Sequence, residues 1–169
     1  MTNQWYALRS KPRKEEVVWR QLHNQGIEAF YPQLRVNPVN PRSRKIRPYF
    51  PGYLFVYTDP SEVGVSLFQW MPHALGLVSF GGEPANVPDN LIITLRKRLE
   101  EIAAAGGEFF DGLQPGDIVR ISDGPFKGYE AIFDARLPGS ERVRVLLELL
   151  GNQRRIPVEL RVGQIQRKK

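Results

Sequence analysis

The sequence contains no cysteine, and His23 and His73 are the only two histidines among its 169 residues. The absence of cysteine excludes a disulfide-stapled secreted scaffold, thiol catalysis and thiolate metal sites. Two histidines cannot form an all-histidine zinc cluster, so we expect no metal. Neither histidine has the neighbour pattern of a nucleophile–base pair, and the Gly81-Gly82 turn lacks the Gly-Lys-Ser/Thr ending of a phosphate loop. We therefore expect neither an enzyme nor a cofactor.

Long apolar runs are also missing from the chain. No stretch approaches the roughly 20 apolar residues that a membrane helix needs. The polar segment 1–6 lacks the basic-then-apolar order of a signal peptide. Hydrophobic residues at 41% and charged residues at 25% are close to globular averages, which argues against wholesale disorder. The sequence predicts a cytoplasmic protein without membrane contact.

Positive charge is in excess. Lys and Arg number 24 against 18 Asp and Glu, a net charge of +6 with a pI near 9.8. Residues 1–104 and 113–169 each carry +4, and the short joint 105–112 carries −2. Residues 37–48 combine three prolines with four basic residues, which is typical of a mobile basic loop. This distribution favours contact with a polyanion.

Strand and helix patterns alternate in the first part of the chain. The order predicts an α+β sandwich, an antiparallel sheet covered by helices. The predicted strands are 5–8, 28–31, 53–57 and 75–80, and the predicted helices are 14–25, 61–70 and 89–102.

Gly106-Gly107 ends the last of these helices, and the pattern then changes to strands and tight turns. We therefore predict a first domain over residues 1–104, a linker over 105–112 and a second domain over 113–169. Regularly spaced turn signals in the second domain predict a small β-barrel. Its predicted strands are 117–121, 129–134, 143–150 and 154–158.

The strand predicted at 53–57 has two distinct faces. Period-two geometry places Tyr53, Phe55 and Tyr57 on one face, and Leu54 and Val56 on the other. The aromatic face could bind a partner, or the strand could be buried on both faces. Composition alone favours burial.

Four motifs of this sequence are similar, in order and spacing, to those of the NusG family. These bacterial transcription elongation factors have an N-terminal NGN domain and a C-terminal KOW β-barrel. The resemblance implies a monomeric, non-catalytic protein that binds RNA polymerase. The motifs are Trp5-Tyr6, the segment from Pro48 to Val56, Gly116–Ile121 with Asp123–Gly128, and Arg155–Leu160.

The resemblance implies three sets of binding residues, one for each partner. An apolar pocket for the clamp helices of the largest polymerase subunit would be formed by Phe50, Pro51, Tyr53, Phe55, Leu77 and Phe80. The non-template DNA strand would contact Lys11, Gln21, Asn24, Gln25, Met71 and Pro72. To these the excess of positive charge adds Arg13, Lys14, Arg42, Arg44 and Lys45 as candidate DNA contacts. A small-subunit ribosomal protein, and in housekeeping members also the termination factor Rho, would bind Pro125, Phe126 and Lys127.

Two branches of the family and one rival class stay open. The stretches 126–133 and 86–88 and the basic loop resemble specialised, operon-specific paralogues of the RfaH type, so we predict an antitermination factor of that branch. The stretch 155–160 follows the housekeeping pattern, which leaves housekeeping NusG as an alternative. An RNA- or ribosome-binding KOW protein without polymerase contact would leave residues 48–57 unexplained.

In RfaH-like proteins the C-terminal segment can fold as a helical hairpin that masks the polymerase site. Residues 140–150 carry a helical stripe at Leu146, Leu149 and Leu150, but their first half also alternates as a strand would. The positions of the family's locking ion pair align with Arg47 and Arg142, which would repel each other. We therefore expect a β-barrel, tethered to the first domain but independent of it.

The basic residues generate a prediction on DNA binding. Single-stranded DNA should bind modestly through Lys11, Arg13 and Lys14, with affinity that falls steeply between about 50 and about 200 mM salt because counterions are released. A titration by fluorescence anisotropy measures this slope. Flat binding over that range would contradict the predicted nucleic-acid contact.

Overall fold

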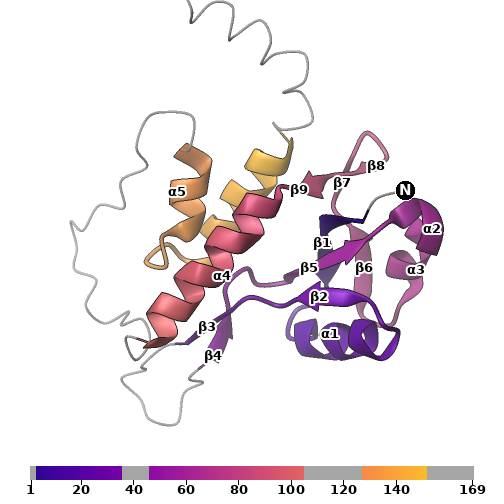
Figure 1. The fold of residues 1–169 in the computed structure, drawn as a ribbon, viewed down its shortest axis with the longest axis horizontal. Helices are drawn as coiled ribbons and strands as arrows, with labels where there is room; N and C mark the ends of the chain where they lie inside the picture. The colour runs from indigo at the N-terminus through magenta and orange to yellow at the C-terminus, as the bar shows by residue number, and fades with distance from the viewer. Residues whose placement is uncertain (1–2, 36–45, 105–126, 152–169) are drawn as a thin grey trace, which may run out of the picture.

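The computed structural model describes residues 3–35, 46–104 and 127–151. β1 (Gln4–Ser10) lies inside a five-stranded sheet and pairs antiparallel with β5 (Tyr53–Thr58), which pairs in turn with β2 (Glu28–Phe30). The other edge of β1 pairs with β6 (Ala74–Leu77) and β9 (Asn86–Val87). All these pairings are antiparallel, which confirms the sheet and the α+β class predicted for the N-terminal part (Figure 1).

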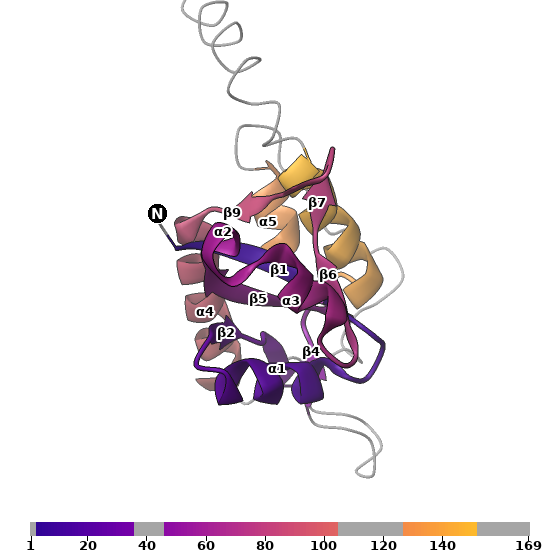
Figure 2. The same ribbon diagram turned by 90° about the vertical axis from the view of Figure 1, so that its right-hand side faces the viewer.

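One face of the sheet is covered by α1 (Glu15–Asn24) and α3 (Val65–Trp70), with α2 (Pro60–Val63) beside them (Figure 2). Leu54 and Val56 of β5 pack here with Leu22 and Phe68. The helix predicted over 61–70 is divided in two because Gly64 has φ 88, outside the helical range.

Two small ribbons extend from this sheet. β3 (Gln33–Arg35) pairs with β4 (Ile46–Pro48), so the end of the predicted basic loop is a strand. β7 (Ser79–Phe80) pairs with β8 (Glu83–Pro84) across the Gly81-Gly82 turn. The strand predicted over 75–80 is therefore divided between β6 and β7.

The other face of the sheet carries the aromatic side chains of β5 and is covered by α4 (Asp89–Ala104). Leu91, Ile92 and Leu95 of α4 are fully or almost fully buried. The Arg96 guanidinium carbon lies 5.4 Å from the centre of the Trp5 ring and 4.8 Å from that of Phe30. The predicted separation of Tyr53, Phe55 and Tyr57 from Leu54 and Val56 is confirmed, since the two sets pack in different clusters.

The C-terminal described residues form a helical hairpin (residues 127–151), composed of α5 (Lys127–Phe133) and a helix over 139–151. The predicted strands at 129–134 and 143–150 are wrong, and no KOW barrel is evident in the described part of the chain. The physical reason is tertiary packing, because the helical stripe at Val145, Leu146 and Leu150 is buried against the N-terminal part. The strands predicted at 117–121 and 154–158 lie outside the described residues.

The hairpin and the N-terminal sheet share one apolar core. Phe55 of β5 and Leu95 of α4 belong to the same cluster of buried residues as Ile132 and Leu146 of the hairpin. Figure 2 shows α4 and the two hairpin helices side by side behind the sheet. The expectation that the two parts are tethered but independent is therefore wrong for residues 127–151.

Leu146→Ala should release the hairpin. Leu146 is fully buried, and truncation of a buried leucine costs about 2–5 kcal/mol. Backbone NMR shifts should show loss of the helical signals of residues 127–151 while the sheet signals persist. Ile93→Ala, at an α4 position that is 65% exposed, is the matched control and should change neither. An unchanged hairpin in Leu146→Ala would contradict the packing described here.

Candidate functional site

The hairpin is joined to the N-terminal part through Tyr49. The ring is fully buried and meets Phe50 edge-on, with 4.9 Å between ring centroids. The Tyr49 hydroxyl donates a hydrogen bond to the carbonyl of Ile132 in α5. The Tyr49 carbonyl accepts a hydrogen bond of 2.7 Å from Nε of Arg142. One residue of the 49–52 turn therefore contacts both helices of the hairpin.

Arg142 is the charged centre of this contact and is only 3% exposed. Its guanidinium carbon lies 4.3 Å from the centre of the Tyr49 ring, a cation–π arrangement. Its Nη1 donates to the carbonyls of Ala135, at 3.3 Å, and of Leu137. The sequence argument expected Arg142 to oppose docking, but these carbonyl and ring contacts accommodate its charge within the interface.

The turn that carries Pro51 is fixed from the opposite side. Gly52 N–H donates to the carboxylate of Glu15 in α1 at 2.8 Å, and the Gly52 carbonyl accepts from Ser10 N–H at 2.8 Å. Gly52 has φ 83, which favours glycine. Pro51 is thereby held against Gly139, where a Cβ atom would lie 2.7 Å from the proline Cγ.

The exposed surface of the 139–151 helix carries a separate charge pattern. Arg144 bonds to Glu141 and to Glu148, the latter at 2.6 Å. The hydrogen bond from Arg144 lowers the pKa of Glu141, and the two carboxylates raise the pKa of Arg144. Spacings of three and four residues place these partners on neighbouring turns, so the pairs support the helical form.

The hairpin covers most of the residues predicted to bind polymerase. Phe50 and Phe55 are fully buried, and Tyr53 is half-buried in the shared cluster. Pro51 contacts Gly139, and Phe80 lies beside Gly151, where a Cβ atom would be 3.2 Å from the Phe80 ring.

Leu77 is separated from this set because it packs on the opposite face of the sheet. Four of the six predicted residues thus lie in or against the cluster that the hairpin shares, and Pro51, which is exposed, contacts Gly139 of the hairpin. Their binding to polymerase stays a prediction.

Two hydrogen bonds bring part of the predicted DNA-binding set together, and DNA binding by these residues stays a prediction. Gln21 of α1 donates through Nε2 to the carbonyl of Pro72 at 2.8 Å, and Lys11 N–H donates to the carbonyl of His73 at 2.9 Å. These bonds hold α1 beside the turn before β6. The other exposed members of the predicted set in this region are Arg13, Lys14, Asn24 and Gln25.

Two side chains at the C-terminal end of α3 differ from the sequence interpretation. The Met71 side chain is only 5% exposed and packs in the core, so it is not part of the exposed surface. Trp70 is 76% exposed and was missed, because a helical apolar pattern gives no sign that one of its members faces water.

The predicted residues Arg42, Arg44, Lys45, Pro125 and Phe126 lie outside the described residues. Lys127 is the first residue of α5. In the part of the chain that the structure describes, no group of three His, Cys, Asp or Glu side chains could hold a metal ion. None of the described helices is long and apolar enough to cross a membrane.

Comparison with known proteins assigns the N-terminal part to a protein family. The family model described as "Transcription termination factor nusG" matches residues 3–96, more than half of the chain. The chain is 26% identical over 159 residues to the transcription termination/antitermination protein NusG of Haemophilus influenzae, covering 91% of this chain and 83% of that protein. It is 26% identical over 129 residues to the protein of the same name from Yersinia pestis, covering 75% of this chain and 68% of that protein.

A solved structure titled "Domain interaction in Thermotoga maritima NusG" aligns with a TM-score of 0.45 and 24% identity, covering 75% of this chain and 76% of that one.

The fold and the family match together define a transcription factor rather than an enzyme. The chain belongs to the NusG family. This family implies that the protein acts in transcription elongation, termination or antitermination and binds RNA polymerase.

Gly139→Ala should weaken the docking of the hairpin, although alanine in a helix is more stable than glycine by about 1 kcal/mol. The added methyl would lie 2.7 Å from Pro51, whose ring cannot rotate away. Hydrogen exchange of residues 127–151 should therefore become faster. Ser140→Ala, at the exposed neighbouring position, is the control and should not accelerate exchange. Slower exchange in Gly139→Ala would contradict the close contact.

Proposed function

We propose that this protein is an operon-specific NusG paralogue of the RfaH type, whose own helical hairpin covers the polymerase-binding face until recruitment. The observation that carries the proposal is the burial of Phe50 and Phe55 in one core with Ile132 and Leu146. A surface that binds a partner through aromatic side chains cannot contact it while those side chains are buried elsewhere.

In this mechanism the hairpin and the polymerase clamp helices compete for the same apolar face of the N-terminal part. With the hairpin docked, the closed form does not bind polymerase. When the hairpin leaves, the face that includes Phe50 and Phe55 becomes available to the clamp helices of the largest subunit. Polymerase then favours the open form by its differential affinity, and the bound factor suppresses pausing without catalysing any reaction.

Recruitment would depend on the surface formed by α1 and the turn before β6. Lys11 and Arg13 supply positive charge for phosphates, and Gln21 is bonded to Pro72 in the turn whose His73 carbonyl accepts from Lys11 N–H. The exposed ring of Trp70 offers a platform on which an unpaired base can stack. These features support recognition of the non-template DNA strand. After release, the segment 113–169 would couple transcription to a small-subunit ribosomal protein.

Housekeeping NusG is the alternative function. The comparisons favour it, because the matched relatives from Haemophilus influenzae and Yersinia pestis carry the name NusG. In that case the free protein would bind polymerase without a prior release of the hairpin, and Rho would be a further partner. Polymerase binding by a protein locked in the closed form distinguishes the two functions.

A disulfide between Pro51→Cys and Gly139→Cys should lock the closed form. The Pro51 Cγ lies 2.7 Å from the Cβ position of residue 139, so the two Cβ atoms fall in the range of roughly 3.5–4.5 Å that disulfides use. No native cysteine competes for the bond. The oxidised variant should bind paused elongation complexes at least ten-fold more weakly than the same variant after reduction, as measured by co-sedimentation.

The reduced double variant is the control for the two substitutions, and the oxidised protein should keep its helical signals in circular dichroism. Equal binding of the oxidised and reduced forms would contradict the masking proposal. It would favour the housekeeping function instead.

A further inference from the structure

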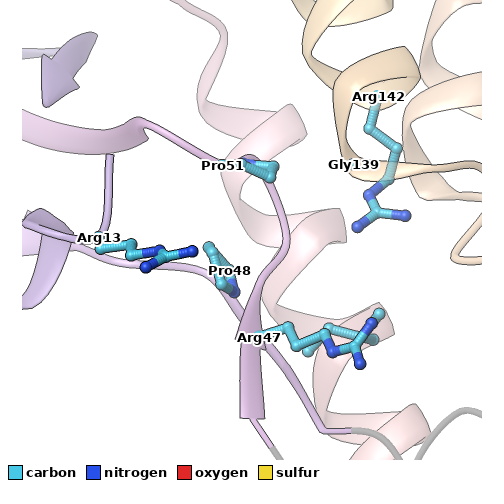
Figure 3. Close-up of a pocket in the computed structure, with 7 residues that line it drawn as sticks. Arg13, Arg47, Pro48, Pro51, Gly139 and Arg142 are labelled. Carbon is cyan, nitrogen blue, oxygen red and sulfur yellow. The ribbon is translucent and has the colours of Figure 1, made fainter. Parts of the chain in front are cut away.

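A cavity of about 530 Å³, here called the α1 cavity, lies between the start of α1, the β3–β4 ribbon and the 49–52 turn. Tyr31, Ile46, Pro48 and Pro51 supply the apolar part of its wall. Pro48 and Pro51 also line a neighbouring cavity that reaches Gly139 of the hairpin (Figure 3). None of the described residues that line the α1 cavity belongs to the hairpin, so its wall comes from the N-terminal part alone.

Glu15, the first residue of α1, lines this cavity with a buried carboxylate. The residue is only 4% exposed, and its Oε2 accepts the 2.8 Å hydrogen bond from Gly52 N–H. Within the described part of the chain, the other oxygen, Oε1, accepts no hydrogen bond and forms no ion pair. A carboxylate offers several lone pairs, and burial of its charge without a positive partner is costly. Glu15 therefore has spare capacity for a cationic donor.

The second oxygen of Glu15 is reached from the cavity. No side-chain oxygen or nitrogen of the described residues is sealed from solvent without a hydrogen-bond partner. Because Oε1 lacks such a partner, it must be open to solvent, and the α1 cavity is the space that Glu15 lines. A cation in this cavity can therefore approach Oε1 without displacing the bond to Gly52.

The charges around the cavity differ in exposure and in pairing. Arg13 has φ 64, in the left-handed region that favours glycine, and its side chain is exposed. It forms no ion pair with Glu15 in the part of the chain that the structure describes. Glu16 also lines the cavity, and its carboxylate pairs with Arg20 at 3.2 Å. Two carboxylates against one guanidinium give the described lining a net charge of −1, in a chain of net charge +6.

The apolar part of the wall suits a cation that carries an apolar stem. Ile46 is 52% exposed at this cavity, so a stem packed against it would remove apolar surface from water. The volume falls within the roughly 300–1,000 Å³ of small-molecule sites. Lysine and arginine side chains have this combination of a charged head and an apolar stem, as do alkyl amines.

We infer that the α1 cavity binds an ammonium or guanidinium group on an apolar stem, with Oε1 of Glu15 as the acceptor. The bond is charge-assisted, and the low exposure of Glu15 shields it from screening by salt. The cation comes either from a basic side chain of a partner protein or from a free amine. Since the described lining includes no hairpin residue, the site serves the closed and the open form alike and does not rest on masking by the hairpin.

The test titrates the full chain with n-butylguanidinium and with its uncharged isostere n-butylurea, at constant ionic strength. The reporter is the Gly52 amide, which donates to the same carboxylate, followed by two-dimensional NMR. n-Butylguanidinium should shift this amide saturably, and n-butylurea should not. Glu15→Gln keeps an oxygen for the Gly52 bond, so it should fold, and it should weaken binding about ten-fold or more. Circular dichroism checks the fold of each variant.

Two further variants have opposite expected outcomes to that loss. Arg13→Gln should tighten binding about two-fold, because it removes a like charge from the lining. Glu62→Gln removes a negative charge from an exposed site on α2 and should bind as the native chain does. No saturable shift, equal binding of n-butylurea, native binding by Glu15→Gln, or weaker binding by Arg13→Gln would overturn the inference.

A second probe distinguishes the two sources of the cation. A capped tripeptide with arginine between two alanines carries the same guanidinium group on a peptide backbone. Tighter binding of the peptide than of n-butylguanidinium assigns the site to a side chain of a partner protein, and the reverse order assigns it to a free amine.

The site and the proposed function can fail separately. Leu146→Ala, which releases the hairpin, should bind n-butylguanidinium as the native chain does. Loss of binding in this variant would overturn the assignment to a cavity of the N-terminal part alone. Equal polymerase binding by the locked and the reduced protein would overturn the masking proposal but leave these titrations standing.

Discussion

Burial of the aromatic face of the sheet is the interaction on which the rest of this structure depends. Phe50 and Phe55 have large apolar side chains that are fully buried. Residues of α4 and of the hairpin together cover them. Full burial of one large apolar side chain contributes about 1.5–3 kcal/mol. The hairpin buries several, so any partner that displaces it must offer a comparable apolar surface.

The polar contacts around Arg142 give this apolar interface its geometry. Apolar packing alone would allow the hairpin to shift along the sheet. The bond from Arg142 to the Tyr49 carbonyl and the bond from Tyr49 to Ile132 tie both helices to one residue of one turn. That turn is fixed in its own right by the carboxylate of Glu15. The register of the hairpin therefore follows from a short chain of hydrogen bonds that begins in α1.

The sequence predicted those elements whose apolar pattern fits only one kind of secondary structure. The alternation of β5 separates its two faces, and the apolar spacing of α4 fits a helix and nothing else. Residues 140–150 fit both a helix and a strand, and the surface that decides between them lies far away in sequence. The ion-pair argument failed because it considered only one partner for Arg142, which binds backbone carbonyls instead. No local pattern could reveal the exposure of Trp70 or the backbone conformation of Arg13.

The shared core also has a consequence for the open form that we propose. A face that includes Phe50, Phe55 and the half-buried Tyr53 would be a contiguous apolar patch once the hairpin leaves, and such patches promote aggregation. On the function proposed above, the docked hairpin would keep this apolar face from self-association while the protein diffuses. A chain that opened far from its partner would be lost to self-association, so on this proposal release would be useful only where the partner is already present.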